Sequence, residues 1–177
     1  MLVCDNCELP VDNGPGAEDS QPLCTPCTAL SERTPPIHVT PLGREDLELV
    51  LAWRSNEQIY RHFRKQDGPL DWDQHISWYD SRPTDRHDFV IHYKDRRVGV
   101  ISVDTTDEVS IYLGDFSSHG HGVATATLRW LCKRFADRTP LMAEIHEDNE
   151  SSKRLFERCE FHQEGRDGSW MEYLYEP

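Results

Sequence analysis

The segment from residue 108 to residue 135 constrains the fold more than any other part of the chain. A strand-like run over residues 108–114 precedes the sequence His-Gly-His-Gly-Val-Ala at residues 119–124, and a stretch with apolar residues at helical spacing follows. The first amides of a helix have no partner of their own, and the helix dipole places partial positive charge beside them. A strand, a glycine turn and a helix start therefore predict an anion-binding corner, and a pyrophosphate is the ligand that we expect there.

The two glycines of this corner, Gly120 and Gly122, support that interpretation because neither carries a Cβ atom that would keep a bulky anion from the backbone. The segment lacks the phosphate-loop pattern with its lysine, and it lacks the three-glycine dinucleotide fingerprint. Taken alone, the pattern also occurs in tight strand-to-helix turns that bind nothing. The identity of the ligand therefore depends on the rest of the chain.

Two Cys-x-x-Cys pairs near the N-terminus predict a metal centre formed by Cys4, Cys7, Cys24 and Cys27. Each pair directs two thiolates at one ion, and two pairs complete a tetrahedral sulfur site. A segment this short cannot bury a stable core unaided, so we expect the metal to supply its folding free energy. Zinc in a structural role is the expected ion. Iron is an alternative, and two disulfides are another that a cytoplasmic setting disfavours.

The chain divides into a small zinc-ribbon-like module at residues 1–31, a linker at 32–36 and a larger domain at 37–177. The prolines of the linker predict a stiff spacer that separates two cores. In the larger domain, alternating apolar residues predict strands and helical spacing predicts helices. The Asp167-Gly168 dipeptide indicates a final hairpin, and Asp95-Arg96 an earlier turn. Expected strands cover 37–40, 89–93, 97–103, 108–113 and 141–146, and expected helices cover 45–53, 57–63, 72–79, 122–135 and 149–159. This order fits a mixed α/β (α+β) sandwich.

Five motifs occur in a fixed order over residues 37–177. They are Trp53-Arg54-Ser55-Asn56, the segment 74–79, the segment 97–101, the glycine corner at 119–124 and the segment 148–161. Together they resemble the motifs of the Gcn5-related N-acetyltransferase (GNAT) superfamily, in which the glycine corner is the acetyl-CoA loop. The nearest similarity is to acetyltransferases of nucleotide-linked amino sugars and of ribosomal-protein N-termini. The resemblance implies a mostly antiparallel mixed sheet flanked by helices, and transfer of an acetyl group from acetyl-CoA to an amine in a ternary complex.

Three positions depart from the family pattern. Phe156 stands where many relatives carry a tyrosine that protonates the leaving thiolate. His119 replaces a glutamine or arginine of the loop. Glu160 replaces a glycine, so the chain there must either avoid a left-handed conformation or be strained.

The resemblance implies roles for several residues. Backbone amides near Leu113 and Gly114 are expected to orient the thioester, and Asn149 and Phe156 to lie along the pantetheine. Glu144 or His146 is the expected general base, unless ordered water carries the proton, and Tyr112 is a possible proton donor. Trp53, Arg54 and Asn56 are expected to contact the acceptor. The pyrophosphate is expected to lie against His119, Gly120, His121, Gly122, Val123 and Ala124.

Three functions remain open at this point. In the first, the acceptor is a nucleotide-linked amino sugar, which the arginines at 54, 61 and 64 favour. In the second, the acceptor is a protein N-terminus. In the third, the chain is a weakly catalytic CoA-binding module whose zinc knuckle docks a partner. Cys132 and Cys159 are expected in the core rather than as nucleophiles. No paired-histidine motif predicts a second metal.

The charge balance argues against nucleic acid as a main partner of the larger domain, and we expect none. Acidic residues number 32 against 19 basic ones, for a net charge of −13, whereas phosphate backbones require a basic face. The excess of aspartate over lysine also suits a halophilic source, although an ordinary acidic surface gives the same balance. No apolar run is long enough for a membrane span and no signal peptide is visible, so we expect a cytoplasmic protein.

Overall fold

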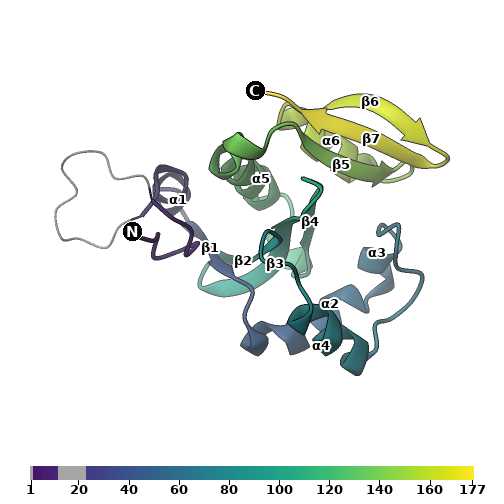
Figure 1. The fold of residues 1–177 in the computed structure, drawn as a ribbon, viewed down its shortest axis with the longest axis horizontal. Coiled ribbons are helices and arrows are strands. Elements are labelled where there is room, and N and C mark those ends of the chain that lie inside the picture. Colours follow the sequence, from purple (N-terminus) through teal and green to yellow (C-terminus); the bar gives the residue numbers. More distant parts are fainter. Residues whose placement is uncertain (1, 12–22) are drawn as a thin grey trace.

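The computed structural model describes residues 2–11 and 23–177, so most of the segment between the two cysteine pairs lies outside the described residues (Figure 1). Two β-sheets form the frame of the molecule, and helices cover their faces. The predicted mixed α/β fold with antiparallel sheets flanked by helices is confirmed. The single mixed sheet that the family resemblance implied is present as two separate sheets, which one isolated bridge joins among the described residues.

The first sheet has four antiparallel strands in the order β1-β2-β3-β4. Its strands are β1 (Ile37–Pro41), β2 (His87–Tyr93), β3 (Arg96–Val103) and β4 (Val109–Leu113). Strands β2 and β3 are joined by Lys94 and Asp95, both with positive φ, as a two-residue hairpin turn of mirror-image type requires. The predicted turn at Asp95-Arg96 is therefore displaced by one residue, since Arg96 already pairs with Tyr93.

The second sheet has three antiparallel strands in the order β5-β7-β6. Its strands are β5 (Leu141–His146), β6 (His162–Asp167) and β7 (Trp170–Tyr175). The hairpin between β6 and β7 turns through Gly168, at φ 60°, as its Asp-Gly signal predicts. A parallel bridge between Glu108 and Met142 joins the two sheets, supported by a 2.9 Å hydrogen bond from the Met142 amide to the Asp107 carbonyl.

The helices begin at capping residues. Asn56, Asp71 and Asn149 each accept a backbone N–H of the first turn that follows, as N-cap side chains do. No helix among the described residues is long and apolar enough to cross a membrane. The helices are α1 (Thr25–Ser31), α2 (Leu47–Arg54), α3 (Glu57–Tyr60), α4 (Trp72–Asp80), α5 (Val123–Arg134) and α6 (Glu150–Arg158), with short 3-10 turns η1 (Arg44–Asp46), η2 (Phe116–Ser118) and η3 (Ala136–Arg138).

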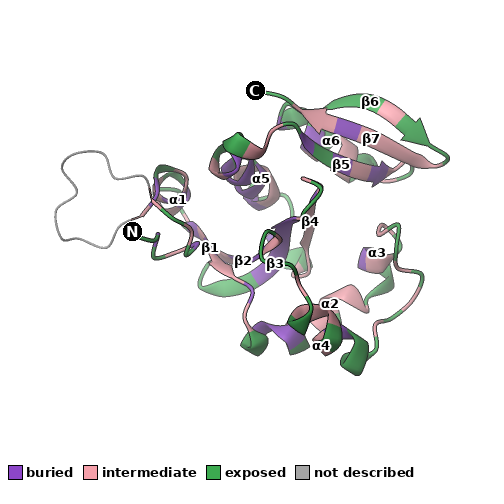
Figure 2. Ribbon diagram, viewed as in Figure 1, coloured by how far each residue is buried: buried purple, intermediate pink, exposed green. Residues whose placement is uncertain are grey.

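The four-stranded sheet is covered on both faces, because successive side chains of a strand point in opposite directions. Phe89 and Ile91 face the larger core, which contains α5, α6 and the second sheet. Val90 and Val100 face a smaller core beneath α2 and α4. Figure 2 shows the buried positions concentrated in the central strands and along α5.

The cysteine module packs into the larger core and is not a separate unit. Helix α1 contacts both α5 and β1, and Leu30 and the four cysteines are buried with α5 residues. The Trp130 indole donates a 3.3 Å hydrogen bond to the Cys27 sulfur, and the Arg134 guanidinium donates to the Pro10 carbonyl at 2.7 Å. The expectation that the linker separates two cores is therefore wrong. Its short span holds α1 against the domain instead.

Candidate active site

A cavity of about 740 Å³ lies where the two sheets separate. Beyond the Glu108–Met142 bridge, the outer edge of β4 and the outer edge of β5 diverge, and β4 pairs on one side only, with β3. The cavity is lined by β4, the N-terminal end of α5, β5, α6, Trp170 of β7 and the segment from Gln58 to Arg64. One end therefore meets the glycine corner, and the other meets the segment that follows α2.

The glycine corner has the geometry of an anion site. Gly120 and Gly122 have φ values of 77° and 75°, in the left-handed region that glycine adopts without strain. Gly122 is the N-cap of α5, and no side chain caps the helix. The amide N–H groups from Gly120 to Thr125 donate no hydrogen bond to any described residue. A run of free donors at the positive end of a twelve-residue helix is well suited to a phosphate.

The two histidines of the corner bond to the loop itself. His119 donates through Nε2 to the Leu113 carbonyl at 3.3 Å, and His121 donates through Nδ1 to the His119 carbonyl at 2.8 Å. Both side chains are exposed. Of the residues predicted to hold the pyrophosphate, all except His121 line the cavity, as does Leu113.

Gly114 plays a packing role that the sequence did not reveal. A Cβ atom at this position would lie 2.1 Å from Cγ of Trp53, so only glycine allows the indole to lie against the end of β4. Trp53 also meets Tyr112 edge-on, with ring centroids 6.5 Å apart. The packing of Trp53 on Gly114 therefore supports the end of β4, the strand that lines the cavity.

The three residues predicted to contact the acceptor do not line the cavity. Arg54 donates to the Gln66 side-chain oxygen at 2.8 and 3.2 Å and lies over the Phe63 ring, and burial lowers the pKa of its guanidinium. Asn56 caps α3, and Trp53 packs on Gly114. Of the three, Arg54 contacts Phe63, which does line the cavity.

The position of Tyr112 does not suit the proton donation expected of it. Tyr112 is among the residues that line the cavity, but its hydroxyl is buried and has no hydrogen-bond partner among the described residues. The side chain packs against the smaller core, and burial raises the pKa of the phenol well above its ordinary value. A buried, more weakly acidic hydroxyl on a side chain packed against the smaller core is poorly suited to protonate a thiolate in the cavity.

Two carboxylates face the cavity from different sheets. Glu144 on β5 forms an ion pair with Arg64, which also pairs with Asp167. Glu108, just before β4, is half-buried, and desolvation raises the pKa of its carboxyl, with further contributions from the negative charges of Asp104 and Glu144. The sequence reasoning missed Glu108. Its signal was an acidic residue at the entry to the central strand.

His146, the other predicted base, does not line the cavity. Its Nδ1 atom accepts the Asp148 amide N–H at 3.3 Å, and its ring meets Trp170 edge-on at 5.2 Å. The imidazole therefore supports the Trp170 wall and the start of α6.

The predicted pantetheine contacts at α6 do line the cavity. Asn149 uses its side-chain oxygen to cap α6 at the Ser152 amide, which leaves its amide N–H₂ group free to donate. Phe156 packs edge-on against Phe161 at 4.9 Å and presents a purely apolar surface. This wall therefore offers one polar contact beside an apolar one.

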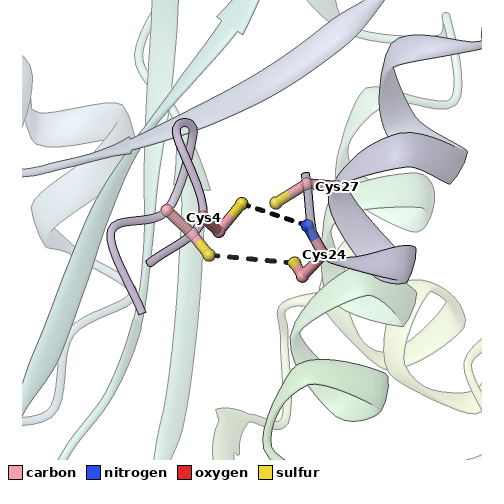
Figure 3. A group of neighbouring side chains, drawn as sticks. Cys4, Cys24 and Cys27 are labelled. Carbon is pink, nitrogen blue, oxygen red and sulfur yellow. Dashed lines mark hydrogen bonds between the residues drawn. The ribbon is translucent and has the colours of Figure 1, made fainter. Parts of the chain in front are cut away.

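A second centre lies among the four N-terminal cysteines (Figure 3). Their sulfur atoms all lie within 4.8 Å of one another, and those of Cys7 and Cys24 are 3.9 Å apart. Zinc–sulfur bonds of about 2.3 Å in a tetrahedron require sulfur separations of about 3.8 Å. A disulfide requires about 2.0 Å. The Cys24 amide donates to the Cys4 sulfur at 3.4 Å, and thiol hydrogen bonds, first from Cys24, lower the pKa of Cys7. This donor set fits one tetrahedral metal ion.

Comparison with known proteins agrees with the family resemblance seen in the sequence motifs. Residues 37–162 match the acetyltransferase (GNAT) domain family. An uncharacterized protein of Methanocaldococcus jannaschii is 36% identical over 140 residues, which cover 71% of this chain and 28% of that protein. The chain thus spans little more than a quarter of the length of this curated relative.

Solved structures share the fold. A domain from Methanocaldococcus jannaschii superposes with a TM-score of 0.72 at 32% identity, over 78% of this chain and 97% of that one. The microcin C7 self-immunity acetyltransferase, in complex with acetyl-CoA and AMP, superposes with a TM-score of 0.63 at 17% identity, over 78% and 91% of the two chains.

Proposed function

This chain belongs to the GNAT acetyltransferase family and carries an acetyl-CoA-dependent N-acetyltransferase domain, and on that premise we propose that its acceptor is the primary amine of a nucleotide-linked amino sugar. The observation that supports this acceptor class is the composition of the cavity wall opposite the glycine corner. Arg61, His62, Arg64 and Trp170 all line that wall. Arginine suits phosphate, and an indole face suits a base or sugar ring.

We propose that acetyl-CoA enters from the glycine corner, with its pyrophosphate at residues 119–124, on the free amides that begin at Gly120. Its pantetheine arm would then lie between the outer edge of β4 and α6, beside Leu113, Asn149 and Phe156. The related microcin C7 immunity enzyme holds acetyl-CoA in the same fold, which supports this placement. The AMP in that structure also supports an acceptor with a nucleotide portion.

The arginines differ in their availability to the acceptor. Arg64 is already paired with Glu144 and Asp167. Arg61 is exposed and has no ion pair among the described residues, although its Nε atom donates to His62 at 3.2 Å. Arg61 is therefore the cation best placed to bind a diphosphate, and Arg54, which bonds to Gln66, takes no part.

We propose that Glu108 is the general base. It accepts the proton of the attacking amine as the nitrogen–carbonyl bond forms and the carbon–sulfur bond breaks. Free amides along the unpaired edge of β4 donate to the carbonyl oxygen as negative charge develops there. The thiolate leaves and takes a proton from water, because an ordinary thiol pKa near about 8.5 makes a dedicated acid unnecessary at neutral pH. Phe156 can therefore stand where relatives have tyrosine.

We further propose that Cys4, Cys7, Cys24 and Cys27 hold one structural zinc ion within residues 1–31. All four coordination positions would be filled by protein, so the ion has no open position for catalysis. Residues 37–177 would form the transferase domain on which this module is packed.

The acceptor proposal is tested by supplying acetyl-CoA with matched acceptors to the wild type and to Arg61→Gln. The panel contains nucleotide-linked amino sugars, the corresponding free amino sugars and short peptides with free N-termini, and acetylated products are identified by mass spectrometry. We expect nucleotide-linked acceptors to react best. Arg61→Gln should raise their KM about tenfold with little change for the free sugars, because a charge-assisted phosphate contact is lost.

Faster reaction with peptides than with nucleotide sugars would assign the acceptor to a protein N-terminus. No product from any amine, despite tight CoA binding, would indicate a binding module without turnover. Either result would overturn the nucleotide-sugar proposal.

A further inference from the structure

An arginine in the linker after the cysteine module, Arg33, reaches the glycine corner. The Nη2 atom of Arg33 lies 3.5 Å from the position that a Cβ atom on Gly122 would occupy. Gly122 is the N-cap of α5, so the guanidinium lies beside the free amides described above. The Arg33 side chain is exposed and forms no ion pair or hydrogen bond with a residue in the described ranges, 2–11 and 23–177.

The module fixes the position of this arginine. The Arg33 amide donates to the Leu30 carbonyl at 3.3 Å, which ties it to the end of α1, and Leu30 is buried in the larger core. Earlier in α1, the Cys27 sulfur accepts the indole N–H of Trp130. Because Cys27 meets residue 130 while Arg33 meets residue 122, α1 and α5 run in opposite directions, side by side in Figure 1. The cysteine cluster thus holds one end of α1, and Arg33 extends from the other.

The glycine corner supplies no cation of its own. The segment from Gly114 to Thr125 contains no lysine or arginine, and the whole chain has a net charge of −13. A polyphosphate approaching this corner meets backbone donors and two histidines within an acidic molecule. A guanidinium held nearby would offset the repulsion and offer a fork of N–H donors matched to phosphate oxygens.

From this juxtaposition we propose that Arg33 binds a phosphate group of CoA, and that the metal-filled cysteine module is the device that holds it there. The inference rests on the function proposed above and adds a residue from outside residues 37–177 to the cosubstrate site. The module is then part of CoA binding as well as of folding.

The test compares Arg33→Gln with the wild type in the full-length, zinc-loaded chain. Calorimetry measures the affinity for CoA and for dephospho-CoA. Arg44→Gln serves as the matched control, because it removes one exposed arginine of η1, which pairs with Asp80 of α4. We expect Arg33→Gln to weaken CoA binding about fivefold to tenfold, and the difference to shrink as salt is added. Arg44→Gln should bind like the wild type.

The two ligands identify which phosphate is bound. An equal loss for CoA and dephospho-CoA assigns Arg33 to the pyrophosphate, and a loss for CoA alone assigns it to the 3′-phosphate. A second arm removes the metal with a chelator under conditions in which circular dichroism shows the fold retained. The wild type should then fall to the affinity of Arg33→Gln, and the variant should lose little more.

Unchanged CoA affinity in Arg33→Gln overturns the inference and leaves the proposed function standing. A wild type that binds no CoA at all overturns both. If chelation weakens the wild type and the variant by the same factor, Arg33 does not depend on the metal, and the role assigned to the module is wrong.

Discussion

At the scale of single residues, Glu108 and Glu144 face the same cavity in different surroundings. Glu144 has a guanidinium partner in Arg64, so its charge is already compensated. Glu108 has no ion-pair partner among the residues that the structure covers, and desolvation raises the pKa of its carboxyl. A carboxylate with a raised pKa binds a proton more tightly, which makes it the stronger base. Because Glu108 also lines the cavity, it is the better candidate to accept the proton of the amine.

We expect Glu108→Gln to lower kcat by about a hundredfold or more, because one positioned general base is lost. Glu144→Gln is the matched control and should leave kcat within a few-fold of the wild type. Steady-state rates across pH provide the measurement. In the wild type, activity should fall as acid protonates Glu108, and this limb should vanish in Glu108→Gln. A larger loss in Glu144→Gln would transfer the role to that residue.

The same substitution should change stability with a defined sign. A raised folded-state pKa means that the native protein binds protons more tightly than the unfolded chain. Ionised Glu108 therefore lowers the free energy of unfolding, and this destabilisation grows as pH rises. Below the ordinary glutamate pKa of about 4.3, the carboxyl is neutral in both states and adds no burden. Thermal melts of Glu108→Gln should therefore show a higher Tm than the wild type at neutral pH and a small difference near pH 3.

At the scale of elements, the end of α6 shows how the chain tolerates its departure from the family pattern. The Phe161 amide donates to the Phe156 carbonyl and the Glu160 amide to that of Glu157, each at 3.1 Å, which is the hydrogen-bond pattern of a Schellman motif. The contact between Phe156 and Phe161 closes the motif. Glu160 adopts φ 70° at the position that glycine normally occupies. The sequence left two possibilities for Glu160, and the structure has the strained one.

Glu160→Gly should raise the free energy of unfolding by about 0.5–1 kcal/mol, because relief of left-handed strain exceeds the added entropy of the unfolded chain. Arg154→Gly, at an exposed position inside α6, is the matched control and should lower it by about 1 kcal/mol. Urea denaturation measures both. Equal destabilisation by the two substitutions would show that Glu160 is unstrained.

Periodicity predicted most elements within one or two residues. Strand β5 begins at Leu141 and ends at His146 as expected, because its alternating side chains face core and solvent in turn. Helix α3 ends at Tyr60 rather than Phe63, since a ring held against Arg54 and Tyr112 determines that segment. Local spacing carries no information about such a distant contact.

The candidate site was predicted only where its chemistry is local. The glycine corner and the cysteine pairs are contained in short motifs, and the structure places each as a compact group. Glu108 and Arg33 acquire their positions from the separation of β4 from β5 and from the packing of α1 on α5. Neither of these tertiary arrangements can be predicted from the residues that flank Glu108 or Arg33 in the sequence.

At the scale of the whole molecule, the cysteine cluster belongs to the same core as the transferase domain. Cys4, Cys27 and Leu30 are buried together with Trp130 and Leu131 of α5. Loss of the proposed metal would therefore weaken packing beyond residues 1–31, which differs from the independent module that the linker suggested.

We expect chelation to lower the Tm of the entire chain by on the order of 10 °C, in a single transition. Far-UV circular dichroism and tryptophan fluorescence should report the same midpoint, because Trp130 contacts Cys27 directly. Metal analysis before and after treatment gives the stoichiometry, with one ion per chain expected. Two separate transitions, with the larger one unaffected by the chelator, would contradict the shared core.

The packing of α1 against α5 has a practical consequence for anyone who shortens this protein. A chain begun at Ile37 would retain every element of the transferase fold, yet it would uncover the side of α5 that Leu30 and the cysteines now protect. The indole N–H of Trp130 would lose its sulfur acceptor, and a newly exposed apolar strip of this kind promotes aggregation. The transferase domain therefore should not be moved on its own, and fusions or domain exchanges should include residues 1–36.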